Sequence, residues 1–398
     1  MKNTKMFSML LLAAVSLSQL SCSRGEEPLS VAVVRSEMVR TGGFMNLDFR
    51  DGDPKWDYTS GLELKAFLDV YDRYGIDSVY EYAEGWYDFM VREDGSMKTY
   101  KVSDYSTDRV CPGNTLFYLY DKTGKEKYRK AMDTLRLQIA GHPRTPEGGF
   151  WHKKVYPSQM WLDGLYMMQP FCAQYTGRYE PEETRAACFE DILNQFLTVA
   201  HHTWDPVTKL YRHAWDSSHD MFWCDPQTGQ SKHAWGRALG WYCMAIVETL
   251  PFVPDGTPGK QEVIDIFKGI FDVLPDFADP ETGMWYQVLD QPGREGNYLE
   301  ATCAAMFSYS MLKGIRLGYL PADMKEYAAR TYENMVSTFV RRNEDGTVDL
   351  TNCCSVSGLG GSGMRSGDFD YYIHEPIRDN DAKGIGPLIW ASLEMENI

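Results

Sequence analysis

The stretch GGFWHKKVYPSQMWLDGLYMMQPF, residues 148–171, joins a turn rich in aromatic and basic side chains to an apolar segment. From Trp161 onward, apolar residues return at three- and four-residue spacing, which predicts a helix. Asp163 falls in its first turn, where a carboxylate faces the positive helix end. An acid surrounded by indole, imidazole and ammonium groups is a candidate proton donor. A helix cap or dipole partner is the other interpretation of this position.

Helical periodicity continues through most of the chain. The clearest helix is predicted at 60–74, opening with the capping-box spacing of Ser60 and Glu63 and ending at Gly75. About twelve helices and very few strand signals place the chain in the all-α class. The other predicted helices are 30–41, 77–93, 109–121, 124–140, 161–176, 181–201, 235–250, 260–276, 297–317, 322–341 and 383–397.

The connections between these helices carry a weak repeat, once per helix pair. Segments that combine a turn with aromatic or apolar residues recur every 54 to 74 residues, which indicates a helical array or a closed toroid. An open solenoid would show more uniform repeats and polar caps. The irregular loops therefore favour a closed, six-hairpin (α/α)6 barrel. The repeat segments are 94–100, 148–154, 209–215, 283–289 and 345–351.

The N-terminal segment predicts export. Two lysines precede a largely apolar stretch at 6–20, which is too short to span a bilayer and is followed by Cys22. We therefore expect a signal peptide at 1–22, with a lipid anchor on Cys22 as in bacterial lipoproteins, and a location in the periplasm or outer membrane. A linker at 23–29 would then lead into a single catalytic domain at 30–398, because no composition break marks a second domain.

Composition excludes several classes of function. A net charge of −16 argues against nucleic acid, and an anionic substrate would need a local group of cations. Of the nine cysteines, the eight other than Cys22 lack C-x-x-C or metal-ligand spacing and are expected to be buried thiols rather than disulfides. Neither G-x-S-x-G nor H-E-x-x-H occurs, so we predict no metal and no cofactor. The glycine-rich segment 357–363 lacks phosphate-loop context and is predicted to be a lid or rim.

Four further clusters could carry chemistry, and each also has an ordinary structural interpretation as a cap, a staple or core packing. Like the cluster around Asp163, they lie at or just before the starts of odd-numbered helices, counted from the helix at 60–74. In an alternating inner and outer toroid those starts share one end, so we expect one cleft. The candidate residues are Trp56, Tyr58, Asp108, His213, Trp235, Arg237 and Trp241.

At this point the chain resembles the unsaturated rhamnogalacturonyl hydrolases of glycoside hydrolase family 105, relatives of the family 88 unsaturated glucuronyl hydrolases. The segments HPRTPEGGFWHKKVYPSQMWLDGLYMMQPF (142–171), WGRALGWY (235–242) and DAKGIGPLIWA (381–391) carry the resemblance. It implies an (α/α)6 barrel. It also implies a substrate with a C4=C5 unsaturated uronic acid, the end left when a lyase cuts pectin.

The resemblance also implies roles for individual residues. Asp163 matches the general acid/base, and Asp108 matches the second catalytic carboxylate. One departure is Ser106, where family members usually have Asn, which leaves the hydrogen-bonding partners of Asp108 open. The residues that match substrate-binding positions are Tyr58, His152, His213, Trp235, Arg237 and Trp241.

The implied chemistry explains these residue types. The substrate is a vinyl ether, so one acid that protonates C4 and then orients water toward C5 serves both steps. Such an acid must be partly protonated near neutral pH, and we expect indole walls and the charge of Asp108 to raise the pKa of Asp163.

Two alternative functions remain. One is an unsaturated glucuronyl hydrolase acting on another plant, algal or glycosaminoglycan oligosaccharide. The other is a non-catalytic glycan-binding lipoprotein, which predicts loss of Asp108 or Asp163.

Overall fold

The computed structural model of the chain describes residues 27–42 and 54–397. The predicted signal peptide and Cys22 lie outside the described residues. Within them the structure has thirteen α-helices, and twelve of these correspond to the helices predicted from the sequence. The thirteenth, α12 (Phe369–His374), is a single short helix that the periodicity did not reveal.

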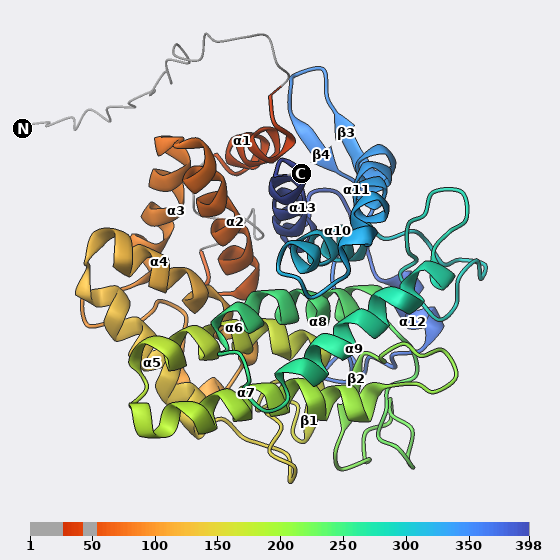
Figure 1. Cartoon of the computed structure of the whole chain (residues 1–398), viewed down its shortest axis with the longest axis horizontal. Coiled ribbons are helices and arrows are strands. Elements are labelled where there is room, and N and C mark those ends of the chain that lie inside the picture. Colours follow the sequence, from red (N-terminus) through yellow and green to blue (C-terminus); the bar gives the residue numbers. More distant parts are fainter. Residues whose placement is uncertain (1–26, 43–53, 398) are drawn as a thin grey trace, which may run out of the picture.

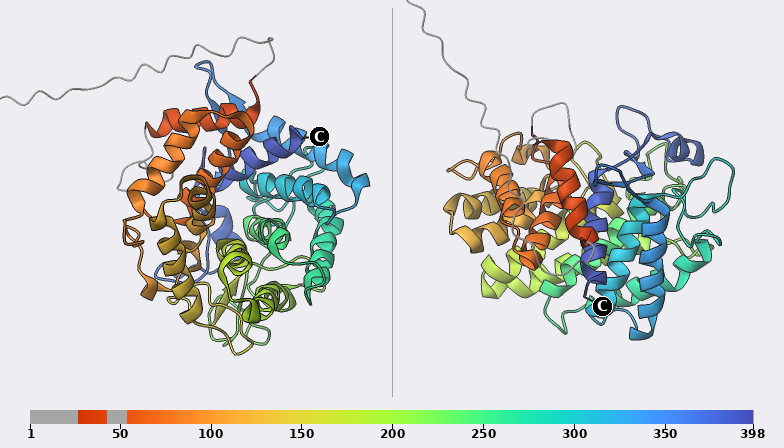
Figure 2. Two further views of the ribbon diagram at one scale, coloured as in Figure 1. Left: turned by 60° about the vertical axis from the view of Figure 1, so that its left-hand side comes forward. Right: turned by 90° about the horizontal axis from the view of Figure 1, so that it is seen from above.

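The helices form two concentric rings (Figure 1; Figure 2, left). Each inner helix packs against its two inner neighbours and an outer partner, and the last inner helix, α13, packs on the first outer helix, α1, to close the ring. This is the predicted (α/α)6 barrel. The inner helices are α2 (Tyr58–Tyr74), α4 (Asn114–Thr123), α6 (Leu162–Tyr179), α8 (Gly236–Thr249), α10 (Ala301–Arg316) and α13 (Ala382–Met395). The outer helices are α1 (Leu29–Thr41), α3 (Asp77–Met90), α5 (Glu126–Gly141), α7 (Glu182–Thr203), α9 (Lys260–Val273) and α11 (Lys325–Phe339).

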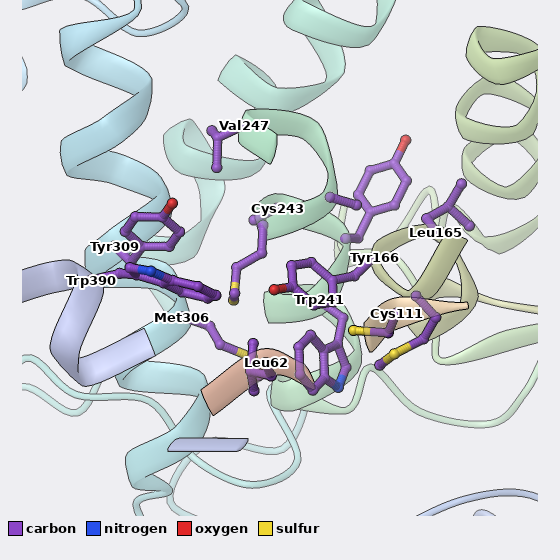
Figure 3. Close-up of a cluster of buried hydrophobic side chains, with 14 of the residues drawn as sticks. Leu62, Cys111, Leu165, Tyr166, Trp241, Cys243, Val247, Met306, Tyr309 and Trp390 are labelled. Atoms are coloured by element: carbon purple, nitrogen blue, oxygen red, sulfur yellow. The ribbon is translucent and has the colours of Figure 1, made fainter. Parts of the chain in front are cut away.

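Burial separates the two rings. Every residue of α8 is buried, as expected of a helix enclosed on all sides, whereas outer helices such as α9 bury only one face. The centre is filled by side chains from several inner helices, among them Tyr166, Trp241 and Met306 (Figure 3). Close packing there depends on Gly240, because a Cβ at this position would lie 2.8 Å from the sulfur of Met306.

Several predicted helix starts differ from the structure, among them those of α2 and α4. Helix α2 begins at Tyr58 and is capped by Asp57, whose side chain accepts a hydrogen bond from the Tyr58 N–H at 2.7 Å. The capping box of Ser60 and Glu63 is therefore wrong, since both residues lie inside the helix. The helix predicted from 109 begins only at Asn114, because the chain first makes the single turns η1 (Val102–Asp104), η2 (Thr107–Arg109) and η3 (Cys111–Gly113).

Three small antiparallel sheets tie together loops at the ends of the barrel. Strand β1 (Gln159–Trp161) pairs with β2 (Ala214–Asp216), which joins the loop before α6 to the loop that leads to α8. Strand β5 (Cys353–Cys354) pairs with β6 (Ile377–Arg378) and closes the base of the long segment before α13. The third sheet pairs β3 (Val340–Arg342) with β4 (Val348–Leu350).

Across the described ranges, no helix combines the length and apolar character needed to cross a bilayer. The eight cysteines that the structure describes are all free, and seven are buried, as expected for thiols in apolar helical surroundings.

Candidate active site

A cavity of about 200 Å³ lies at the N-terminal ends of the inner helices. It brings together seven of the eight site residues predicted from the sequence; the exception is His213. Asp108, Asp163 and His152 therefore come from different helix starts and loops that meet at one end of the barrel, as predicted from the sequence. The cavity is lined by Tyr58, Asp108, His152, Lys153, Tyr156, Trp161, Asp163, Met167, Trp235, Arg237, Trp241, Val356, Ser357, Arg365 and Lys383.

Asp163 lies in the first turn of α6, but it does not cap that helix. The N-cap position is Trp161, and α6 has no side-chain cap. The Oδ2 atom of Asp163 is buried and accepts no hydrogen bond from any described residue. The cap interpretation of Asp163 is therefore wrong. A carboxyl group that lines a cavity without being tied to the helix is free to exchange a proton with a ligand.

His213 lies behind Asp163 and not in the cavity. Its side chain is completely buried, and its Nε2 atom lies 3.3 Å from Oδ2 of Asp163. The other ring nitrogen, Nδ1, is 2.7 Å from the hydroxyl of Tyr372. Burial raises the pKa of Tyr372 well above its ordinary value, so the hydroxyl keeps its proton. When that hydroxyl donates to Nδ1, the imidazole proton resides on Nε2, facing Asp163. His213 is thus placed to act on the acid and not to touch the sugar.

Asp108 occupies a different environment from Asp163. It lies in the single turn η2, and its carboxylate forms an ion pair with Lys153 and lies 3.7 Å from Nε2 of His152. Burial alone would raise the pKa of Asp108, but Lys153, with smaller contributions from His152 and Arg109, holds that pKa below its usual value. Asp108 is therefore an ionised carboxylate. The alternative interpretation of Asp108 as a helix cap is wrong, because neither η2 nor α4 has a side-chain cap.

One wall of the cavity consists of three nearly parallel rings. The rings of His152 and Trp161 stack with centroids 4.4 Å apart, and Tyr156 stacks on Trp161 at 5.0 Å. Burial lowers the pKa of His152 to about 3, so the imidazole is neutral at ordinary pH. Its Nδ1 lies 3.2 Å from the hydroxyl of Thr107. Flat rings at the edge of a polar cavity offer an apolar surface to the C–H face of a sugar.

The floor of the cavity comes from the start of α8. Trp235 is fixed by a hydrogen bond from its Nε1 to Oε1 of Gln287 at 3.0 Å. Arg237 is 1% exposed and donates from Nη1 to the carbonyl oxygen of Cys354 at 2.6 Å. Among the described residues it forms no ion pair, and its Nε has no hydrogen-bond partner. A buried guanidinium without a carboxylate favours an anionic ligand in the cavity.

Comparison with known proteins agrees with this arrangement. The profile of Glycosyl Hydrolase Family 88 matches residues 30–398. The chain belongs to glycosyl hydrolase family 88. This family 88 chain is similar to the solved glycoside hydrolase of family 105 from C. acetobutylicum ATCC 824, with 39% identity and a TM-score of 0.88 over 94% of this chain and 100% of that one.

Two curated proteins are also similar to this family 88 chain. Unsaturated rhamnogalacturonyl hydrolase YesR of Bacillus subtilis (strain 168) is 28% identical over 283 residues, which cover 70% of this chain and 76% of YesR. Protein Atu3128 of Agrobacterium fabrum is 35% identical over 237 residues, which cover 56% of this chain and 96% of that protein. The chain is accordingly a glycosidase with the barrel that the resemblance implied.

The sequence missed several residues that line the cavity of this family 88 protein. Lys153 was visible as one of two adjacent lysines, and its position next to His152 was the only signal. Tyr156 and Arg365 belong to loops whose course is set by tertiary contacts, so no local pattern indicated them. Trp56, by contrast, was a candidate platform for a sugar, but it is fully buried and donates from Nε1 to the carbonyl oxygen of Arg109 at 2.8 Å.

Proposed function

We propose that the chain removes a 4,5-unsaturated uronic acid from the non-reducing end of oligosaccharides that a lyase has generated. We further propose that this sugar is unsaturated galacturonic acid linked to rhamnose in rhamnogalacturonan fragments. Two features of one cavity carry the proposal: Oδ2 of Asp163 accepts no hydrogen bond from a described residue, and the buried Arg237 forms no ion pair with one. The likeness to YesR supports the choice of rhamnogalacturonan.

The geometry suits hydration of a vinyl ether. Asp163 donates its proton to C4, and the ring-oxygen electrons stabilise the cation that forms at C5. The resulting carboxylate of Asp163 takes a proton from water as the water oxygen bonds to C5. The hemiketal then opens, the C1–O bond to the next sugar breaks, and the aglycone leaves with a hydroxyl group. The proton count balances, and Asp163 returns to its starting form.

The other residues hold the sugar in this scheme. The ionised carboxylate of Asp108 accepts hydrogen bonds from sugar hydroxyls, and its negative charge favours the cationic transition state. Arg237 binds the uronate carboxylate at the cavity floor. The volume of about 200 Å³ is below the 300 to 1,000 Å³ of pockets for drug-sized ligands. One sugar fits inside, so cleavage would occur at the chain end.

The proposed substrate can be tested by absorbance. The conjugated double bond absorbs in the ultraviolet, and its signal should disappear when the enzyme is mixed with lyase-treated rhamnogalacturonan. Digests of homogalacturonan and of glycosaminoglycans, tested alongside, would rank the substrates. In deuterated water the label should appear at C4 of the released sugar. Turnover without deuterium at C4 would exclude the hydration mechanism.

We also propose export and lipid attachment at Cys22, which rest on the sequence alone. The test is a Cys22→Ser variant expressed in a bacterial host and fed a labelled fatty acid. We expect the wild-type chain to carry label and to sediment with membranes. The variant should lose both properties, and unlabelled wild-type protein would contradict the proposal.

A further inference from the structure

The cavity rim contains a second arginine that the proposed reaction does not use. Four cationic side chains line the cavity, and two of them are neutralised: Lys153 by Asp108, and Lys383 by Asp381, which is 2.8 Å away. The other two, Arg237 and Arg365, have no carboxylate within ion-pair distance among the described residues. In a chain with a net charge of −16, two unpaired arginines at one cavity are unusual.

The two arginines occupy different depths. Arg237 is buried in the floor, whereas Arg365 is only partly buried. The partly exposed residues that line the cavity mark its mouth, and Arg365 lies there with Tyr58, Tyr156 and the exposed Val356. Since the cavity has room for one sugar, the rest of an oligosaccharide must pass this mouth.

Arg365 is held in place by the glycine-rich segment at 357–363. Its Nε donates to the carbonyl oxygen of Gly360 at 3.1 Å, and its Nη2 donates to the hydroxyl of Tyr156 at 2.9 Å. A Cβ at Gly358 would lie 2.3 Å from Nη1, so the guanidinium occupies the space that any other side chain would need. The glycines therefore make room for a fixed arginine.

The remaining donors of Arg365 are free. No hydrogen bond from Nη1 to a described residue exists, and Nη1 is not among the buried atoms that lack a partner, so it is accessible. A guanidinium fixed by Nε and Nη2, whose Nη1 makes no hydrogen bond to a described residue, can bind an anion without further loss of side-chain freedom.

We propose that Arg365 binds the carboxylate of an acidic sugar in the aglycone, outside the one-sugar cavity. This inference rests on the proposed function and adds to it a preference for oligosaccharides that carry a second uronate. Arg237 would take the carboxylate of the terminal unsaturated sugar, and Arg365 that of a later one. Tyr156 links the two regions, because it both anchors Arg365 and stacks on Trp161.

The experiment compares two substrates. The neutral-aglycone probe is the unsaturated galacturonyl-rhamnose disaccharide, and the acidic probe is the corresponding tetrasaccharide, which contains a galacturonate. In Arg365→Gln we expect KM for the tetrasaccharide to rise about tenfold, as for loss of a charge-assisted hydrogen bond. The kcat for both probes, and KM for the disaccharide, should stay near wild type. Added salt should reduce the difference between the probes in wild type.

Two further variants make the result specific. Gly358→Ala should reproduce the selective rise in KM, because its Cβ displaces the guanidinium. Arg294→Gln removes an arginine that also lacks an ion pair but does not line the cavity, and it should change nothing. Unsaturated digalacturonate, with its carboxylate on the adjacent sugar, shows which aglycone position is recognised.

The outcomes separate the two proposals. If wild type cleaves both probes and Arg365→Gln weakens both equally, Arg365 binds the terminal sugar or merely shapes the loop, and the inference is wrong. An unchanged KM for every acidic probe would also overturn it. If wild type cleaves neither probe, the proposed function fails before Arg365 is tested.

Discussion

The two ends of the inner ring of helices differ in whether the cations that line their cavities are paired with carboxylates. At the end where the helices start, a cavity of about 200 Å³ is lined by two arginines that have no acidic partner within residues 27–42 and 54–397. At the end where they finish, a larger cavity of about 420 Å³ is lined by four cations, and each has a carboxylate. Those pairs are Lys65–Asp69 at 2.9 Å, and Arg178–Asp121, Lys313–Glu248 and Arg316–Glu394 at 2.6 Å each.

This comparison suggests a criterion for a ligand-binding cavity: unpaired buried charge rather than volume. Cavity size favours the opposite end, whereas unpaired charge favours the end with Asp163 and Arg237, which is the candidate site. Buried ions are normally paired because an isolated charge is costly. Where a buried ion has no partner in the protein, we expect a ligand of opposite charge to pair with it. If this criterion holds, substitutions at the end where the helices start should mainly reduce activity, and substitutions at the other end should mainly reduce stability.

The largest effect is expected for Asp163→Asn. The amide cannot donate a proton to C4, so kcat/KM should fall at least about a thousandfold, equivalent to roughly 4 kcal/mol. Loss of unsaturated-bond absorbance measures it, with circular dichroism to confirm the fold. The control is Asp69→Asn, the same chemical change at the opposite end, which should retain activity. Full activity in folded Asp163→Asn would refute the assignment.

The next largest effect concerns stability, in Glu248→Gln. Glu248 is buried and accepts hydrogen bonds from Lys313 and Tyr309. Breaking a buried pair leaves an unpaired lysine, so the free energy of unfolding should fall by about 3 kcal/mol. Denaturant titration measures this, and kcat should be nearly unchanged. A large loss of kcat with normal stability would contradict the contrast between the two ends.

The same residue predicts a pH effect. Burial would raise the pKa of Glu248, but Lys313 and Lys65 outweigh it and lower that pKa to about 2. A carboxylate with a depressed folded pKa stabilises the fold above its unfolded pKa and loses that contribution as pH falls. Wild type should therefore lose stability between about pH 4.5 and 2. Glu248→Gln should show a shallower loss in that range.

A smaller effect is expected for Arg237→Gln, which removes the floor cation. Without its charge-assisted hydrogen bonds, KM for an unsaturated uronide should rise about thirtyfold, near 2 kcal/mol, with a smaller change in kcat. Arg237→Lys keeps the charge but not the forked geometry and should fall between wild type and Arg237→Gln. An unchanged KM would show that another residue holds the carboxylate.

The smallest effect is a shift in pH dependence for Lys153→Ala. Burial raises the pKa of Asp108, and in wild type Lys153 is the largest of the contributions that together lower it. Without Lys153 that pKa rises, so the acidic limb of kcat/KM against pH should move to higher pH. The matched control is the neighbouring Lys154→Ala, since Lys154 is exposed and does not line the cavity. A limb that stays in place in Lys153→Ala would show that Asp108 does not govern it.

The sequence predicted the barrel well because helical periodicity is local. The twelve long helices, and the common end at which the inner ones start, follow from spacing alone. The short helix α12 and the single turns before Asn114 were missed because fewer than two turns carry no periodicity. Helix α2 starts earlier than predicted because Asp57, not Ser60, caps it.

The candidate site was predictable where a residue lies at a helix start or in the loop just before one. Asp163 and Arg237 share that position, so the pattern found them. His213 was predicted to bind substrate, but it lies behind Asp163 and outside the cavity, and this depth depends on the pairing of β1 with β2, which the sequence does not reveal. Arg365 reaches the cavity through a loop folded by contacts with Tyr156, some 200 residues earlier in the chain. The catalytic roles themselves stay predictions.

Closure of the ring by α1 and α13 has a consequence for biosynthesis. The sixth inner helix follows all the others in the chain, and its side chains complete the packing of both α2 and α10. A growing polypeptide therefore cannot finish this architecture piece by piece as it leaves the ribosome. We expect the apolar faces of the first five helix pairs to stay incompletely packed until α13 has been synthesised. Ser30 then bonds to Glu396 at 2.8 Å, joining the first helix to the end of the last.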